Sequence, residues 1–291
     1  MVLVGGICIG FAPIGLRLGL DDLGPQAIAF WRYVFALPIL FALACIANKG
    51  FPRKPNRFVV LAGICFTCNI ALWHWGLEIT SVANATFLVN CGNALVGFAA
   101  WLFLGERPAR IWFFAILIAL SGAAILTRYG TGTPMPGASD IPAYYGDLLA
   151  VAAAVFVGLY MLSAKLACRT LRGLETIFWI TAVEICVAAL FVLGSGESFM
   201  PQQVTGFQIP LFLALAVQVA GQGLIVVGLG KTPAGIAGLL VVVQPVVAAA
   251  AAWLLFSEPL TIIQICGAML ILSGIWLVQQ GRPTTKTYTV D

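Results

Sequence analysis

The hexapeptide Trp-Leu-Phe-Leu-Gly-Glu at residues 101–106 returns as Trp-Leu-Leu-Phe-Ser-Glu at residues 253–258, which is 152 residues later. The same offset joins further pairs on both sides of it: Gly76 with Gly228, Thr80 with Thr232, and Ser121-Gly122 with Ser273-Gly274. An ungapped offset held over this length indicates an internal duplication. The chain is therefore interpreted as two copies of one unit.

Long apolar segments make up most of each copy. Hydrophobic residues form 61% of the 291 residues and charged residues only 9%, whereas soluble domains carry about 25% charged residues. A helix of about 20 apolar residues spans the hydrocarbon core and satisfies its own backbone hydrogen bonds. We therefore predict an all-α integral membrane protein with ten transmembrane helices, near residues 2–18, 25–47, 57–77, 83–104, 109–127, 145–167, 175–193, 210–228, 235–256 and 260–279. The first segment is expected to be a membrane helix and not a cleaved leader.

A polar insertion rich in Gly, Thr and Pro divides the ten segments into two sets of five. We predict a first repeat at residues 1–127, an external linker at 128–144, a second repeat at 145–280 and a cytoplasmic tail at 281–291. Five is an odd number, so the second repeat must enter the membrane upside down. Inverted repeats of this kind are typical of secondary transporters, with a central cavity between the halves. We expect the fifth and tenth segments to pack outside this cavity as scaffold and the other eight to line it.

The distribution of basic residues gives the predicted orientation. If the N-terminus is cytoplasmic, 12 of the 15 Lys and Arg residues fall in loops or the tail on the inner side: Lys49, Arg53, Lys54, Arg57, Arg107, Arg110, Lys165, Arg169, Arg172, Lys231, Arg282 and Lys286. Basic loops mark the cytoplasmic side. Both termini are therefore expected in the cytoplasm, and the expected location is a bacterial inner membrane.

The repeat motifs carry a family resemblance. Two five-helix units, each with a Trp-to-Glu motif (Trp101 to Glu106, Trp253 to Glu258) followed by a Leu-Ser-Gly helix, resemble the EamA-type members of the drug/metabolite transporter superfamily. Arg32 and the stretch from Tyr160 to Lys165 are similar to amino acid exporters of the YddG type. The resemblance implies ten helices around a central cavity and alternating access without ATP hydrolysis.

Polar residues inside apolar segments are the candidate binding residues, because such side chains usually face a cavity or a partner helix. The 152-residue offset pairs Arg32 with Glu184 in the seventh segment. These two charges either neutralise one another or hold the carboxylate and ammonium groups of an amino acid. The alternative is that each snorkels to the interface or makes a fixed interhelical contact. Asn90 and Asn93 lie one turn apart and suit a zwitterionic ligand, although Asn also joins helices by interhelical hydrogen bonds.

The second repeat adds two glutamine candidates. Gln218, four residues before Gln222, either lines the cavity or packs between helices. Gln244 precedes Pro245, and proline leaves a helix carbonyl unpaired and kinks the axis, which opens backbone acceptors toward a cavity. A purely structural kink is the alternative.

Aromatic residues complete the candidate site. Trp73, Tyr160 and Trp179 are candidates for the wall that holds a substrate side chain, and packing within the bundle is the alternative. His74, the one histidine, either takes part in substrate or proton binding or is a wet residue beside interfacial tryptophans.

The residues favour transport of a small molecule over other functions. The sequence contains no Gly-x-x-x-x-Gly-Lys-Ser/Thr loop, no His-Glu-x-x-His pair and no Gly-x-Ser-x-Gly elbow, so we expect no enzyme, cofactor or metal. The short basic clusters do not predict nucleic-acid binding. An amino acid exporter for aromatic and other neutral amino acids is the preferred prediction, as a monomer in contact with membrane lipid. The alternatives are an exporter of other metabolites or drugs, or, from another class, a non-transporting membrane subunit or an enzyme.

Overall fold

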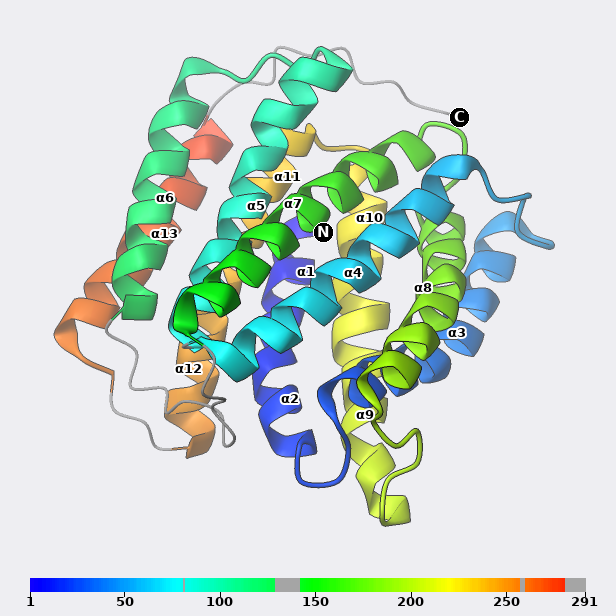
Figure 1. The fold of residues 1–291 in the computed structure, drawn as a ribbon. Helices are drawn as coiled ribbons and strands as arrows, with labels where there is room; N and C mark the ends of the chain where they lie inside the picture. Colours follow the sequence, from blue (N-terminus) through cyan, green and yellow to red (C-terminus); the bar gives the residue numbers. More distant parts are fainter. Residues whose placement is uncertain (81, 129–141, 257–259, 281–291) are drawn as a thin grey trace.

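The computed structural model describes residues 1–80, 82–128, 142–256 and 260–280, and all of its regular elements in these ranges are helical (Figure 1). The first half contains α1 (Val2–Ile9), α2 (Ala12–Gly19), α3 (Pro25–Asn48), α4 (Arg57–Ile79), α5 (Val82–Leu104) and α6 (Arg110–Arg128). The second half contains α7 (Ala143–Ala167), α8 (Gly173–Ser195), η1 (Val204–Phe207), α9 (Gln208–Leu213), η2 (Ala214–Gln222), α10 (Gly223–Leu229), α11 (Ala234–Val241), α12 (Gln244–Phe256) and α13 (Ile262–Gln280).

Each of the ten predicted apolar segments lies on helix. Within the described residues, nine helical spans are long and apolar enough to cross a membrane. The remaining apolar helix, Arg110–Leu126 within α6, is shorter, and its 17 residues lie at the lower limit for a membrane span. The protein is therefore a multi-pass membrane protein with at least nine apolar spans, and ten crossings remain a prediction. The predicted linker and tail fall largely outside the described residues.

Two of the spans are broken at their middle. In the first span, α1 ends at Ile9 and α2 begins at Ala12, just before Pro13. In the ninth segment, α11 ends at Val241 and α12 begins at Gln244, so the kink predicted at Gln244-Pro245 is confirmed as a break. Proline has no N–H to donate to the carbonyl four residues earlier, which explains why both breaks lie beside one.

A third irregularity lies in the span from Val204 to Leu229. Its centre, η2, is a π-helix of nine residues. The 3₁₀-helix η1 and the short α-helix α9 precede it, and the α-helix α10 follows it. The whole span has 26 residues, whereas α4 in the first half has 23. π-helical turns accommodate extra residues and occur frequently at functional sites.

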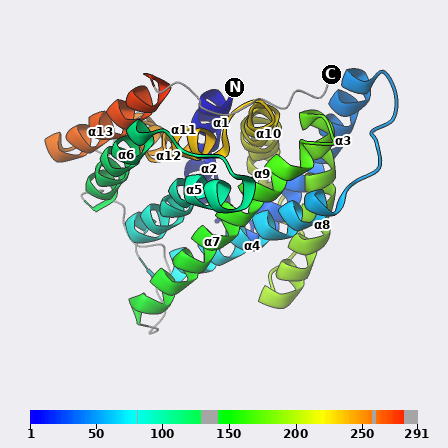
Figure 2. The same ribbon diagram turned by 90° about the horizontal axis from the view of Figure 1, so that it is seen from above.

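Helices from the two halves pack against one another in the centre. In Figure 2, α4 and α7 run side by side, and α3 packs along α8. The pair formed by α6 and α13 stands apart at one flank, where a Cβ atom on Gly267 would lie only 2.8 Å from the Gly122 carbonyl oxygen. Close backbone approach at small residues is how helices associate without a hydrophobic driving force. These two helices are the fifth and tenth segments of the predicted scaffold.

Polar contacts between chain connections close one end of the bundle, which we call the basic end (the upper side in Figure 1). Glu106 accepts a hydrogen bond from the Ala234 N–H (2.7 Å), and Lys165 donates to the Leu229 carbonyl (2.9 Å) and lies 3.7 Å from the Glu106 carboxylate. Buried Glu175 joins the same end by accepting from the Arg53 N–H at 2.8 Å. The loops that carry most of the basic residues therefore share one side of the molecule.

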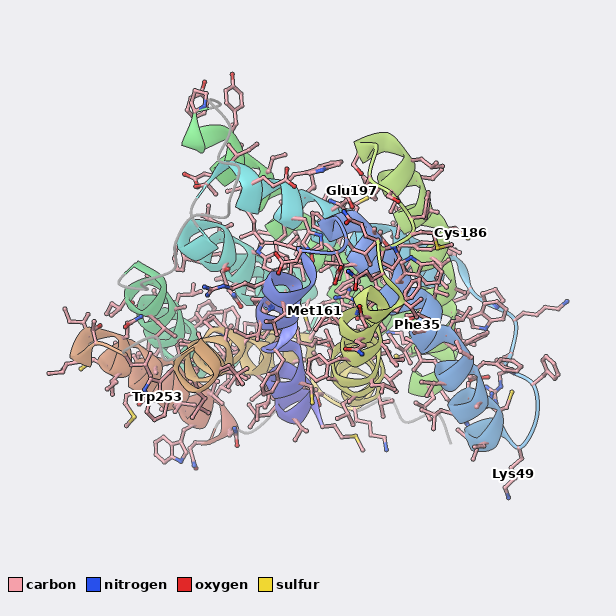
Figure 3. All side chains as sticks on the ribbon, turned by 90° about the horizontal axis from the view of Figure 1, so that it is seen from below. Phe35, Lys49, Met161, Cys186, Glu197 and Trp253 are labelled. Carbon is pink, nitrogen blue, oxygen red and sulfur yellow. The ribbon has the colours of Figure 1, made fainter. Side chains whose placement is uncertain are left out.

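A second set of contacts joins the other end. Glu197 follows α8 and accepts from the Ala27 N–H (2.9 Å) in the first turn of α3, and Thr80 donates to Asp147 at 2.7 Å. Figure 3 shows this end toward the viewer, with Glu197 beside the start of α3 and Lys49 far away at its end. Trp253 lies at the outer flank, half exposed, as expected for a lipid-facing residue.

Candidate functional site

A central cavity lies between the two halves. Its empty volume is about 1050 Å³, counting the part open to solvent. The first span, α3, α4 and α5 line it from the first half, and α7, the span from Val204 to Leu229, α11 and α12 line it from the second. None of its described lining residues comes from α6, α8 or α13. The predicted position of α6 and α13 outside the cavity agrees with this lining, whereas the seventh segment, α8, which was also predicted to line the cavity, contributes no described residue to it.

One face of α4 supplies a large part of the wall. Phe66, Asn69, Ile70 and Trp73 all line the cavity, and their spacing of three and four residues puts them on one stripe of the helix. Asn69 donates from Nδ2 to the Ala153 carbonyl at 2.9 Å, which fixes its amide against α7. The stripe therefore combines aromatic surface with a fixed amide group.

The two broken spans meet at the cavity. Gly10, between α1 and α2, lies so close to α12 that a Cβ atom there would be 2.5 Å from Val247. Ile9 and Val241 both line the cavity, and each carbonyl lies four residues before a proline that has no N–H to offer it. The breaks therefore add backbone acceptors to the wall.

Several polar side-chain atoms in this wall are buried and have no hydrogen-bond partner within the described chain. They are Arg32 Nε, His74 Nδ1, Asn90 Oδ1 and Asn93 Oδ1, and all four residues are at most 5% exposed. Arg32 keeps one contact, from Nη2 to the Tyr33 hydroxyl at 2.8 Å, and Asn90 Nδ2 donates to the Thr86 carbonyl at 2.8 Å. An unpaired buried polar atom costs about 1–3 kcal/mol, so these atoms are suited to a polar ligand.

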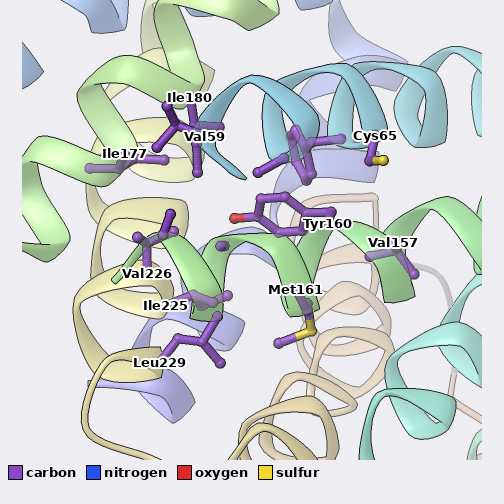
Figure 4. Packing of buried hydrophobic residues seen from close by; sticks show 14 of the residues in the cluster. Val59, Cys65, Val157, Tyr160, Met161, Ile177, Ile180, Ile225, Val226 and Leu229 are labelled. Atoms are coloured by element: carbon purple, nitrogen blue, oxygen red, sulfur yellow. The ribbon is translucent and has the colours of Figure 1, made fainter. Parts of the chain in front are cut away.

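Tyr160 forms the wall on the side of α7. Its ring packs on Phe66 with centroids 4.7 Å apart, and its hydroxyl donates to Gln222 Oε1 at 3.0 Å. Figure 4 shows the ring between α7 and α4, with the hydroxyl directed to the side where Val226 and Ile177 lie. Tyr160 thus connects the cavity to the π-helix.

Comparison with known proteins identifies the family. The model of the EamA-like transporter family matches residues 1–128 and, separately, residues 144–279. The chain belongs to this family. The chain is also similar to the uncharacterized transporter YetK of Bacillus subtilis, at 26% identity over 95% of this chain and 81% of the relative.

Two further relatives have names that include a cargo. One is the pseudopaline exporter CntI of Pseudomonas aeruginosa, at 24% identity over 84% of this chain and 82% of the relative. The other is a probable terminal-alkyne amino-acid exporter of Streptantibioticus cattleyicolor, at 24% identity over 66% of this chain and 60% of the relative. A solved crystal structure superposes with a TM-score of 0.79 at 16% identity, covering 96% of this chain and 97% of the other, which shows a shared fold.

The structure of this EamA-like transporter brings seven of the ten predicted binding residues to one cavity: Arg32, Trp73, His74, Asn90, Asn93, Tyr160 and Gln244. Glu184, Gln218 and Trp179 do not line it. Trp179 lies near the start of α8 and donates from its indole to the Arg53 carbonyl at 2.8 Å, so it belongs to the basic end. Its prediction as part of the cavity wall is not supported by this placement.

Glu184 and Gln218 lie together behind the wall. Gln218 Nε2 donates to Glu184 Oε2 at 2.6 Å and to Thr181 Oγ1 at 2.9 Å, and all three residues are fully buried. Among the described residues, Glu184 and Arg32 form no ion pair with one another, and each retains an unpaired polar atom. Mutual neutralisation is therefore not observed, Glu184 makes the fixed interhelical contact that was the alternative, and shared substrate binding stays a prediction.

The register used to pair Arg32 with Glu184 also changes in the structure. The starts of α5 and α11, Val82 and Ala234, keep the offset of 152 residues, but the N-caps of α3 and α8, Gly24 and Arg172, are only 148 residues apart. The extra residues of the span that contains the π-helix lie between these two regions. The offset measured after that span therefore cannot be carried back to α3 and α8.

Sequence reasoning missed Asn69 and Thr86 as cavity residues, and it gave Gln222 only as a neighbour of Gln218. Asn69 was detectable, because it is a polar residue inside an apolar segment and lies one turn before Trp73. Gln218 and Gln222 were expected to share one environment, yet Gln218 contacts α8 and Gln222 contacts α7.

Proposed function

We propose that this EamA-like transporter exports amino acids, aromatic and other neutral ones, by alternating access about the central cavity. The observation that carries the proposal is that Arg32, His74, Asn90 and Asn93, each of which has an unpaired polar atom, line the same cavity. The Arg32 guanidinium and His74 suit a carboxylate, and the Asn90 and Asn93 amide oxygens suit an ammonium group. Aromatic surface from Trp73 suits the substrate side chain.

The names of two relatives support this class of cargo without fixing it. One is called an amino-acid exporter and the other a pseudopaline exporter. An exporter of other metabolites in the same fold is the second candidate. A substrate with several phosphate groups is disfavoured, because Arg32 is the one Lys or Arg among the described lining residues.

The test is counterflow of labelled amino acids in sealed vesicles that contain the purified full chain. Neutral amino acids should exchange, and Asn93→Ala should weaken binding by about 10- to 100-fold, because a hydrogen bond to a charged group contributes about 1.5–3 kcal/mol. Trp179→Phe is the matched control, since Trp179 lies outside the cavity. If no amino acid exchanges, or if both variants act alike, the assignment fails.

We further propose ten crossings as two inverted repeats, residues 1–127 and 145–280, in a bacterial inner membrane with both termini in the cytoplasm. The shared offset of 152 between the starts of α6 and α13 (Arg110 and Ile262) and the gathering of basic loops at one end support this arrangement. Green fluorescent protein fused to the C-terminus should fluoresce, whereas alkaline phosphatase fused there should be inactive. The opposite pattern would exclude a cytoplasmic C-terminus.

A further inference from the structure

Glu184 is a carboxylic acid in an unusual position. It lies in the middle of α8, is fully buried, and accepts a hydrogen bond from Gln218 Nε2 to its Oε2 at 2.6 Å, with the Thr181 side chain as a further hydrogen-bond partner. Its other oxygen, Oε1, has no donor. An ionised carboxylate in this setting is costly, because a buried charge needs both pairing and hydrogen bonds. Ionisable residues at this depth usually have a function.

Gln218, the hydrogen-bond partner of Glu184, also has an unpaired buried oxygen. Gln218 Oε1 is also buried without a donor, although Gln218 Nε2 makes two hydrogen bonds. Glu184 and Gln218 are hydrogen-bonded to one another, yet each also has a buried oxygen that receives no hydrogen bond. A proton on Glu184 Oε1 would remove the charge and turn this acceptor into a donor.

Titratable groups surround this pair from the neighbouring helices. Arg32 and Tyr33 approach from α3 and Tyr160 from α7, within electrostatic reach of Glu184. From α4, His74 lies within reach of the same arginine. The helices η2 and α10 contribute no titratable side chain. Arg32 is thus the one cation among these groups when His74 is neutral.

We propose that Glu184 is a proton-binding site whose occupancy is linked to the binding of a carboxylate at Arg32. Arg32 lines the cavity, whereas Glu184 is not among its described lining residues, so a ligand can reach the guanidinium without displacing Glu184. With Glu184 ionised, one cation and one anion balance. A substrate carboxylate then adds an uncompensated charge in a medium of low dielectric constant, and protonation of Glu184 relieves it.

The chemical step is a single proton transfer. Glu184 Oε1 takes a proton from water, forms an O–H bond and becomes neutral, and the reverse step returns the proton. Substrate carboxylate and proton therefore favour each other's binding by the same factor. The existence of the proton site does not depend on the proposed function, whereas its link to the ligand rests on it.

Infrared difference spectroscopy tests the proton site without any substrate. The purified full chain should show a protonated-carboxyl stretch that decreases as the pH rises and that is absent from Glu184→Gln. Glu78→Gln, at an exposed position, should keep this band. Gln218→Met should shift its frequency, since the hydrogen bond to Oε2 is lost. A carboxyl titration that is identical in the native chain and in Glu184→Gln would overturn the proposal.

Binding of a neutral amino acid at several pH values tests the link. The dissociation constant of the native chain should fall as the pH falls, by up to tenfold per pH unit where Glu184 titrates, because one proton is taken up. In Glu184→Gln, which resembles the protonated acid, it should not change. A flat profile in the native chain refutes the link, while a titrating band without any amino acid binding refutes the proposed substrate and leaves the proton site standing.

Discussion

The substitution Glu106→Gln should open the basic end of the transporter. The Glu106 carboxylate connects the end of α5 to the start of α11 through the Ala234 N–H, and it lies 3.7 Å from Lys165 on α7. Its side chain is 13% exposed, so water screens these contacts only partly. The three elements come from both halves of the chain. Their separation is required if the cavity is to open toward this end.

The size of the effect follows from what the amide retains. The new side-chain amide still accepts the Ala234 N–H, but a neutral bond is weaker than a charged one by about 1 kcal/mol. The ion pair with Lys165 contributes up to about 1 kcal/mol, and the carboxylate at the N-terminus of α11 about 0.3–1 kcal/mol. The total of about 2 kcal/mol corresponds to a shift of roughly 30-fold toward the open state.

Cys168 is a native reporter of this opening. It follows α7, and its Sγ lies 3.6 Å from the Val226 carbonyl and 3.7 Å from Thr176 Oγ1. Burial raises the pKa of its thiol to about 11, so little reactive thiolate exists at neutral pH while the end is closed. Exposure to water returns the pKa toward its ordinary value of 9.0 and increases the reactivity.

The assay is the rate of alkylation of each cysteine by a water-soluble maleimide, followed by mass spectrometry. In Glu106→Gln, Cys168 should react roughly 30-fold faster if opening and closing are faster than alkylation. Cys186 and Cys266 lie on the outer surface of the spans α8 and α13, where lipid covers them, so they and buried Cys65 should stay unmodified unless the protein unfolds, which separates opening from unfolding. A Cys168 rate within about twofold of the native chain would refute the role given to Glu106.

Other perturbations test separate parts of the structure. Gly267→Val should lower the melting temperature by overpacking against the Gly122 carbonyl, at a cost of about 1–3 kcal/mol, and leave amino acid affinity unchanged; a loss of affinity in still-folded protein would contradict the scaffold role. Glu197 accepts the Ala27 N–H, yet burial raises its carboxyl pKa above the ordinary 4.5, so it favours the folded state when protonated. Its contribution should be present below pH 4.5 and be lost as the pH rises through the raised pKa, and Glu197→Gln should remove this component from melting curves measured across that range. Pro245→Ala supplies an N–H at the break in the ninth segment, so it should raise thermal stability and slow counterflow; unchanged counterflow would show that the break has no role in transport.

The apolar pattern predicted the positions of the helices well because the requirement behind it is simple. A backbone in lipid must form helix wherever about 20 apolar residues follow one another, whatever its neighbours are. The break beside Pro245 was predictable for an equally local reason. The break beside Pro13 has the same cause and was not predicted, although the proline was visible.

The winding of η2 and the environment of Glu184 were beyond local reasoning. No residue between Ala214 and Gln222 is a helix breaker other than Gly221, so the π-helix depends on the helices that pack against it. Its extra residues changed the register between the halves, which made Arg32 and Glu184 look equivalent. Trp179 was misplaced because its partner, the Arg53 carbonyl, belongs to a loop whose position is fixed by buried Glu175.

The unpaired atoms form two layers with different consequences. In the outer layer, atoms of Arg32, Asn90 and Asn93 face the cavity, where a ligand can satisfy them. In the inner layer, Glu184 and Gln218 do not line the cavity, and a proton can pair their unpaired oxygens. An unpaired buried polar atom costs about 1–3 kcal/mol, so a ligand or proton that pairs these atoms binds more favourably. Under the proposal, the substrate carboxylate and Glu184 both interact with the single charge of Arg32, so a change of charge at one of them alters the free energy of the other.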